Sequence, residues 1–316
     1  MLYYERIPRF EKAPCWKVKL SIMEKPVKIN RKEVAALLPR RGDAGTKGDF
    51  GTLLCVCGSR DMPGAALLSA GAALRCGVGL VALASVPPVL EAARQSLWEA
   101  VTLPLPADEQ GHISAVGCAR ILEYRRATAL LVGCGLGRST AGTRLLARLA
   151  RDDSRPIVID ADGLNALCGA LPRFDPGRPA VLTPHMGEMA RLTGIDAETL
   201  RQDRGGHAAA LARQTGAVVV LKDSVTHIAA PDGRLWLLDR PNSGLAKGGS
   251  GDVLAGCIAA FLAQGLDAPT AALLGAAVHS RAGARAAERL GKYGMLPRDV
   301  IESIPAAIKE LEEGIL

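Results

Sequence analysis

Short apolar runs recur along this 316-residue chain, each ended by a glycine or a polar residue and followed by a longer helical stretch. Such runs are typical of buried strands, and strands that alternate with helices favour a parallel sheet covered on both faces. We therefore predict an α/β fold. Residues 64–76, rich in Ala and Leu, are predicted to form a helix. The predicted strands are residues 52–57, 80–84, 128–132, 156–159, 180–182 and 217–221.

Two further runs, residues 225–229 and 234–238, flank the turn sequence Pro-Asp-Gly. They indicate a hairpin, and so an antiparallel edge to the sheet. The chain after residue 251 is predicted to be helical. Since neither an internal repeat nor a long linker is visible, we expect one domain over residues 28–316, preceded by a loose extension at residues 1–27.

Ligands of such sheets bind beyond the carboxyl ends of the strands. Polar residues or glycines follow several of the predicted strands, and we expect them to meet at one rim of the sheet. These residues are Ser59, Gly133, Asp160, Thr183 and Lys222.

Composition excludes several classes of function. The basic residues that give the chain its net charge of +7 are scattered and do not form the dense basic patch with stacking aromatics that is typical of a nucleic-acid interface. Apolar runs are too short to span a bilayer, and the N-terminus lacks the pattern of a signal peptide, so we expect no membrane partner and a cytoplasmic protein. Eight cysteines without C-x-x-C spacing give no support for a zinc or redox site.

A glycine-dense loop, NSGLAKGGSGDVLAG at residues 242–256, is the strongest functional signal. Glycine lets the backbone approach a ligand closely, and the amides at a helix N-terminus attract anions. In the first turn of the predicted helix, Asp252 is placed to take a proton from an attacking hydroxyl. Asp252 can also cap the helix, a role worth about 1 kcal/mol, and both roles can hold together. The predicted anion hole consists of the amides of Gly248, Gly249, Ser250 and Gly251.

Taken in order, several segments resemble the ADP- or ATP-dependent NAD(P)H-hydrate dehydratases, a branch of the ribokinase-like superfamily. The resemblance covers nearly everything after residue 28. It implies a three-layer α/β/α fold with a mostly parallel central sheet. The segments are KGDFG at 47–51, GSRDMPGAA at 58–66, GCGLG at 133–137, DADGLNAL at 160–167, TPHMGEMARL at 183–192, KDSVT at 222–226 and the Asp252 loop.

The resemblance implies repair of a hydrated nicotinamide cofactor. The S-epimer of hydrated NADH or NADPH carries a hydroxyl on its reduced ring. A phosphoryl group from ADP would convert this hydroxyl into a good leaving group, and loss of phosphate would restore NADH or NADPH with release of AMP. ATP remains an alternative donor, because the sequence does not distinguish the two nucleotides.

Individual residues match positions of that family. Ala65 and Gly135 match contacts to the hydrated nicotinamide, and His185 matches a substrate-binding histidine. Asp252 matches the catalytic base and also contacts the substrate. The nucleotide is implied to contact Lys222, Asp223, Ser224, Val225, Thr226 and Gly251.

Magnesium is the implied metal, and Glu188 lies where ribokinase-like enzymes often place a magnesium-linked carboxylate. Glu188 can equally be a surface charge on a helix, and Asp160 is a weaker candidate of the same kind. Two positions depart from the family pattern: Asp223 replaces a glycine, and Met186 replaces a proline. A carboxylate at residue 223 would repel phosphate if it pointed inward, which puts nucleotide affinity or donor choice in question.

Two rival functions share these residues. A kinase of a small alcohol, such as a vitamin precursor, would use the same loop and base and release a stable phosphorylated product. A nucleotide sensor without catalytic activity would keep the loop but has no need of Asp252. The resemblance further implies a homo-oligomer, most simply a tetramer, and we expect a separate protein to carry out epimerisation.

Overall fold

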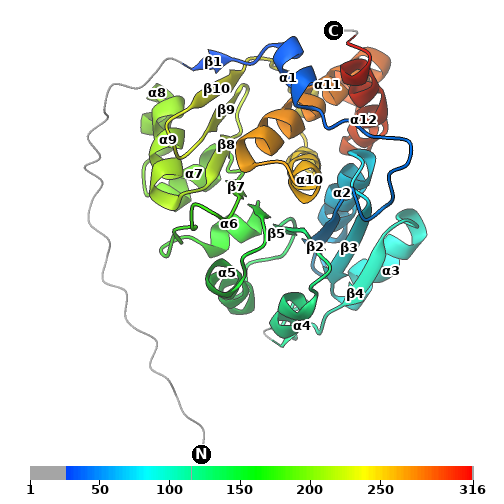
Figure 1. Cartoon of the computed structure of the whole chain (residues 1–316). Helices are drawn as coiled ribbons and strands as arrows, with labels where there is room; N and C mark the ends of the chain where they lie inside the picture. Colours follow the sequence, from blue (N-terminus) through cyan, green and yellow to red (C-terminus); the bar gives the residue numbers. More distant parts are fainter. Residues whose placement is uncertain (1–25, 115, 315–316) are drawn as a thin grey trace, which may run out of the picture.

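The computed structural model describes residues 26–114 and 116–314, which are arranged around one ten-stranded sheet (Figure 1). The strand order is β1-β10-β9-β8-β7-β6-β5-β2-β3-β4. β9 is antiparallel to both of its neighbours, and all other pairs are parallel. The strands are β1 (Val27–Lys28), β2 (Thr52–Val56), β3 (Leu80–Ser85), β4 (Val101–Pro104), β5 (Ala129–Val132), β6 (Ile157–Ile159), β7 (Ala180–Leu182), β8 (Val218–Leu221), β9 (Thr226–Ala229) and β10 (Leu235–Leu238).

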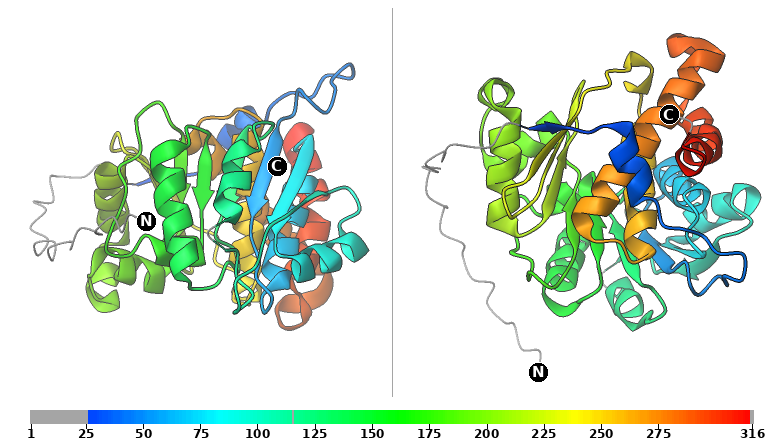
Figure 2. Two further views of the ribbon diagram at one scale, coloured as in Figure 1. Left: turned by 90° about the horizontal axis from the view of Figure 1, so that it is seen from below. Right: turned by 45° about the horizontal axis from the view of Figure 1, so that its top comes forward.

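Helices cover both faces of the sheet, which gives the three layers predicted from the sequence (Figures 1 and 2). On one face of the sheet, α10 packs against both α2 and α11, and α12 also packs against α2 and α11. The helices are α1 (Arg31–Leu37), α2 (Pro63–Arg75), α3 (Pro87–Ser96), α4 (Gly117–Glu123), α5 (Thr140–Asp152), α6 (Asp162–Ala166), α7 (Met186–Thr193), α8 (Ala197–Gln202), α9 (Arg204–Thr215), α10 (Ser250–Ala263), α11 (Ala268–Gly294) and α12 (Pro297–Glu312), with a 3₁₀ turn η1 (Ser243–Leu245).

α10 is the central helix of its layer. Every residue from Val253 to Ala263 is buried, because the helix contacts the sheet through β5 and β6 and is flanked by α2 and α11. A helix that is apolar on all sides is stable only in such a position. Its N-terminus is thereby held at the carboxyl rim of the sheet.

The predicted strands and the helix at residues 64–76 are confirmed to within two residues at each end. The antiparallel hairpin near one edge is confirmed, and the two-residue strand β1 pairs in parallel with β10 outside it. The predicted domain boundary at residue 28 therefore falls inside β1. Residues 1–25 of the predicted extension lie outside the described part of the chain.

β4 was not predicted from the sequence. All four of its residues are exposed or half-buried, so the segment lacks the apolar run by which the inner strands are recognised. Among the described residues, none of the helices combines the length and the apolar character required to cross a bilayer.

Candidate active site

The N-terminus of α10 presents free backbone amides. Gly249 precedes the helix with a φ of +97°, a left-handed conformation that glycine adopts without strain. The amide of Ser250 donates to the carbonyl of Lys247 at 3.2 Å, and that of Val253 donates to Gly249 at 3.1 Å. Within the described residues, the amides of Gly248, Gly249 and Gly251 have no backbone acceptor, so these three are the free donors of the predicted anion hole.

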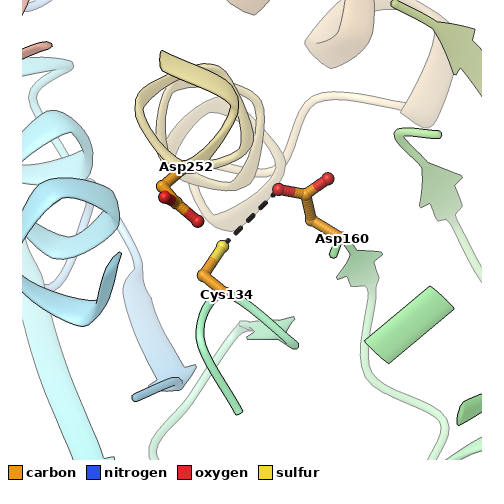
Figure 3. Close-up of side chains that lie close together, drawn as sticks. All are labelled: Cys134, Asp160 and Asp252. Carbon is orange, nitrogen blue, oxygen red and sulfur yellow. Dashed lines mark hydrogen bonds between the residues drawn. The ribbon is translucent and has the colours of Figure 1, made fainter. Parts of the chain in front are cut away.

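Asp252 lies in the first turn of α10, as predicted, and projects toward the loop after β5 and the end of β6 (Figure 3). There it meets Cys134 and Asp160, and one ligand atom from each of the three residues lies within 4.8 Å of the others. The thiol of Cys134 donates to Oδ2 of Asp160 at 3.7 Å. Two carboxylates and a thiol therefore share one small, mostly buried space.

Lys222, at the end of β8, neutralises part of this charge. Its Nζ lies 2.6 Å from Oδ1 of Asp160, whose side chain is 1% exposed, and Thr183 donates its hydroxyl to the same oxygen at 2.7 Å. Burial would lower the pKa of Lys222, but Asp160 and Glu188 outweigh it and the net shift is upward. The ammonium group therefore stays charged at neutral pH.

The pKa of Asp252 is raised from 3.8 to about 7. Burial is the largest cause, followed by the charge of Asp160, while Cys134 and Lys222 act in the opposite direction. A carboxylate with a pKa near 7 is well matched to proton abstraction at neutral pH, because it is partly ionised yet basic enough to bind a proton.

Ala65 and Gly135 are brought into contact by the fold. A Cβ at Gly135 would lie 2.7 Å from the Cβ of Ala65 and 2.9 Å from the carbonyl of Met62, and the φ of Gly135 is +63°. Glycine is therefore required here on two grounds, space and backbone conformation. The two predicted nicotinamide contacts form one surface at the start of α2, next to Cys134.

His185 caps α7. Its Nδ1 accepts from the amides of Gly187 at 2.9 Å and Glu188 at 3.3 Å, while Oε2 of Glu188 accepts from the His185 amide at 2.8 Å. The second oxygen of Glu188 lies 3.3 Å from Nε2 of His185. Both oxygens of this buried carboxylate are thus engaged by His185, in a capping box. The predicted metal role of Glu188 and the substrate role of His185 stay predictions.

A cavity of about 620 Å³ opens beside the N-terminus of α10. Such a volume is typical of a site for a small molecule. Its lining includes polar residues as well as Leu238, Pro241, Leu245 and Leu254. Of the residues predicted to bind the nucleotide, Lys222, Asp223, Ser224, Thr226 and Gly251 line the cavity together with His185 and Ser250, and Val225 is not part of its wall.

Asp223, the unusual carboxylate at this cavity, is not free. Its Oδ2 accepts a hydrogen bond from Nε of Arg204 at 2.8 Å, and about a quarter of each side chain is exposed. The guanidinium group of Arg204 therefore offsets the charge that would otherwise repel a phosphate.

Comparison with known proteins identifies the family to which this site belongs. A family described as NAD(P)H-hydrate dehydratase matches residues 53–306, which is most of the chain. The chain belongs to this family.

Curated relatives agree. The ADP-dependent (S)-NAD(P)H-hydrate dehydratase of Xanthomonas campestris is 36% identical over 87% of this chain and 94% of its own length. The bifunctional NAD(P)H-hydrate repair enzyme Nnr of Moorella thermoacetica is 41% identical over 88% of this chain and 53% of its own length. The chain thus spans about half the length of the bifunctional relatives and nearly all of the single-function one.

Solved structures extend the likeness. The ADP/ATP-dependent NAD(P)H-hydrate dehydratase of Bacillus subtilis, co-crystallized with ATP and Mg²⁺, has a TM-score of 0.81 at 29% identity, covering 91% of this chain and 99% of that one. A ribokinase-like superfamily protein of Enterococcus faecalis has a TM-score of 0.79 at 22% identity, covering 95% of this chain and 99% of that one. These neighbours confirm the predicted ribokinase-like fold of this dehydratase-family chain.

The cluster of Cys134, Asp160 and Asp252 is a poor closed site for Mg²⁺. Mg²⁺ takes oxygen ligands, and the thiol is the wrong type of donor. Lys222 already lies against one carboxylate. The arrangement fits instead an ion that is held mainly by nucleotide phosphates and water, with one carboxylate nearby.

Two features of this family site escaped the sequence analysis. In the sequence, Cys134 is part of a glycine turn, and no motif marks Arg204. Nothing in the sequence placed Arg204 beside Asp223, because 19 residues and a strand separate them. The run of polar residues at strand ends was the useful signal, since it correctly brought Asp160, Thr183 and Lys222 together.

Proposed function

We propose that residues 28–316 form one catalytic domain that dehydrates the S-epimer of hydrated NADH or NADPH with ADP as phosphoryl donor, releasing AMP and phosphate. The single observation that carries the proposal is Asp252, a mostly buried carboxylate with a pKa of about 7 at the N-terminus of α10. It lies in the first turn of that helix, beside the free amides, and close to Cys134, the chain neighbour of Gly135. Relatives that carry this activity in their names support the choice of substrate.

The proposed reaction has two steps. Asp252 takes the proton of the ring hydroxyl while the hydroxyl oxygen attacks the terminal phosphorus of ADP, and the bond from that phosphorus to the bridging oxygen breaks to release AMP. The electron pair of the ring nitrogen then expels phosphate by breaking the C–O bond of the phosphorylated ring, and loss of a proton to water from the neighbouring ring carbon restores the C=C bond of the dihydronicotinamide. Phosphate is a far better leaving group than hydroxide.

The residues around the phosphate have distinct roles in this proposal. The amides of Gly248, Gly249 and Gly251 would bind the equatorial oxygens of the transferring group, where charge accumulates. Lys222 is close to the same place, since a Cβ at Gly251 would lie 3.2 Å from its Nζ. The ammonium group would hold the terminal phosphate in line with the hydroxyl.

Magnesium belongs to the same proposal. When bound, it would neutralise charge on the nucleotide phosphates. Asp160, beside Asp252, and Glu188, whose charge acts on Lys222, are the carboxylates that could bind a water of the ion. A tetrameric state, a cytoplasmic location and a separate epimerase stay predictions, and the bifunctional relatives show by their names that a second activity can be joined to this one.

The test is to incubate the purified protein with hydrated NADH, Mg²⁺ and either ADP or ATP, while following the absorbance of the restored dihydronicotinamide. We expect recovery that requires a nucleotide and is lost in Asp252→Asn. Glu198→Gln, a change on the exposed side of α8, serves as the control and should behave as wild type. No recovery with either nucleotide would refute the dehydratase, and a screen of small alcohols for stable phosphorylated products would then test the kinase.

A further inference from the structure

Arg191, on α7, has an oriented side chain that the proposed reaction does not use. Its Nε donates to Oδ1 of Asn165 at 2.8 Å, although the residue as a whole is exposed. Among the described residues, its two terminal nitrogens have neither a hydrogen-bond acceptor nor a carboxylate within ion-pair distance. A guanidinium group that is already held in place loses less entropy when it binds an anion, so its free donors suit a ligand.

Asn165 belongs to a chain of hydrogen bonds that reaches the glycine turn after β5. Its Nδ2 donates to Oδ1 of Asp162 at 3.3 Å, and Oδ2 of Asp162 accepts from the amide of Gly137 at 2.9 Å. Arg138, the next residue of that turn, is exposed and makes no side-chain hydrogen bond or ion pair within the described part of the chain. The network therefore has an arginine at each end, and its one carboxylate pairs with neither of them.

Both arginines lie near the predicted contacts of the substrate. Arg138 is three residues beyond Gly135 on the same turn. A Cβ at Gly187 would lie 2.9 Å from Cε1 of His185 and 3.6 Å from Nη1 of Arg191, so the imidazole and the guanidinium group both lie against the first turn of α7. Burial is the main cause that lowers the pKa of His185, and the charge of Arg191 acts in the same direction.

The position of the two arginines favours the hydrated cofactor over the donor nucleotide as their ligand. Neither of them lines the 620 Å³ cavity in which the donor is proposed to bind. In the hydrated cofactor one ribose separates the ring from a pyrophosphate, and hydrated NADPH carries a further phosphate on its second ribose. The planar fork of arginine binds a phosphate through two parallel hydrogen bonds.

We propose that Arg191 and Arg138 bind a phosphate group of the hydrated dinucleotide, and that Asn165 positions Arg191 for this contact. The two arginines are then affinity-determining residues for the substrate and not for the phosphoryl donor. The inference rests on the proposed function in one respect only, namely that the second ligand of this site is a nicotinamide dinucleotide.

The test measures binding without turnover, by calorimetry with NADH, NADPH and, in the presence of Mg²⁺, ADP. NADH and NADPH are the products of the proposed reaction and carry the same phosphates as its substrates. Arg191→Met and Arg138→Met should each bind the dinucleotides about tenfold more weakly and keep the affinity of wild type for ADP. Equal losses for NADH and NADPH identify the pyrophosphate as the group that is bound, and a loss for NADPH alone identifies its additional phosphate.

Further variants separate contact from structure. Arg191→Lys keeps the charge but loses the fork and the bond from Nε, and should recover part of the affinity. Asn165→Ala removes only the acceptor that orients Arg191 and should weaken dinucleotide binding about threefold. Arg201→Met is the matched control, since Arg201 is also an exposed arginine, on α8, and pairs with Glu198; it should bind all three ligands as wild type does. Circular dichroism checks that each variant is folded.

Folded Arg191→Met and Arg138→Met that keep the affinity of wild type for NADH and NADPH would overturn the inference. So would a loss confined to ADP, or wild type that binds neither dinucleotide. Dinucleotide binding that depends on the two arginines, without recovery of NADH in the activity assay, would refute the dehydratase and leave this inference standing. Recovery of NADH together with unchanged dinucleotide binding in the two variants would refute this inference alone.

Discussion

Replacing Asp252 with asparagine should have opposite effects on activity and stability. The asparagine side chain has nearly the same shape but cannot accept the proton of the hydroxyl, so we expect a loss of about 10²–10⁴ in kcat. The ionised carboxylate is also costly to bury beside Asp160, as its raised pKa of about 7 shows. Removing the charge should therefore make the folded protein more stable at high pH.

The magnitude follows from the pKa. An upward shift from 3.8 to about 7 is roughly three pKa units, and at 1.36 kcal/mol per unit ionised Asp252 destabilises the fold by at most about 4 kcal/mol above pH 7. Because the folded state holds the proton more tightly than the unfolded state, this penalty is absent below pH 3.8 and grows as the pH rises to 7. The stability advantage of Asp252→Asn over wild type should increase by about 2–3 kcal/mol between pH 5 and pH 8.

Urea unfolding of both proteins at pH 5 and pH 8, followed by circular dichroism, measures the free energies of unfolding. Glu198→Gln is the control, because 80% of that side chain is exposed and its replacement should change stability by less than about 0.5 kcal/mol at either pH. An advantage of Asp252→Asn that is equal at the two pH values, or absent at pH 8, would show that Asp252 is not a buried base with a raised pKa.

Two further predictions concern the cations of the site. Lys222→Met leaves the buried carboxylate of Asp160 without its cationic partner and should lower the free energy of unfolding in urea at pH 7 by about 3–5 kcal/mol. The control, Lys28→Met, breaks an exposed ion pair and should lower it by less than about 1 kcal/mol. Similar losses in the two variants would contradict this role of Lys222. Arg204→Gln should weaken ADP binding about two- to fivefold at low salt, because the charge of Asp223 is then no longer offset. The double change Arg204→Gln, Asp223→Gly should restore binding in calorimetry, and simple addition of two losses would argue against the pairing.

Much of the fold could be predicted from the sequence. The inner strands are buried on both faces and therefore appear as continuous apolar runs. The glycines of the segment at residues 242–256 indicate where α10 begins. β1 and β4 could not be predicted in this way, since they are short and at least partly exposed edge strands. The hydrophobic pattern reports burial, and an edge strand lacks it.

The sequence by itself determined the inner strands, the hairpin, the rim residues, the position of Asp252 and the family resemblance, because these depend on local pattern and order along the chain. Tertiary structure decided the electrostatics. The pairing of Asp160 with Lys222, 62 residues apart, and of Arg204 with Asp223 depends on strand order and helix packing. The raised pKa of Asp252 likewise comes from burial and from charges on other elements. Coulomb interactions depend on the distances between charged side chains. Because the local sequence does not encode distances across a sheet, it cannot predict these interactions.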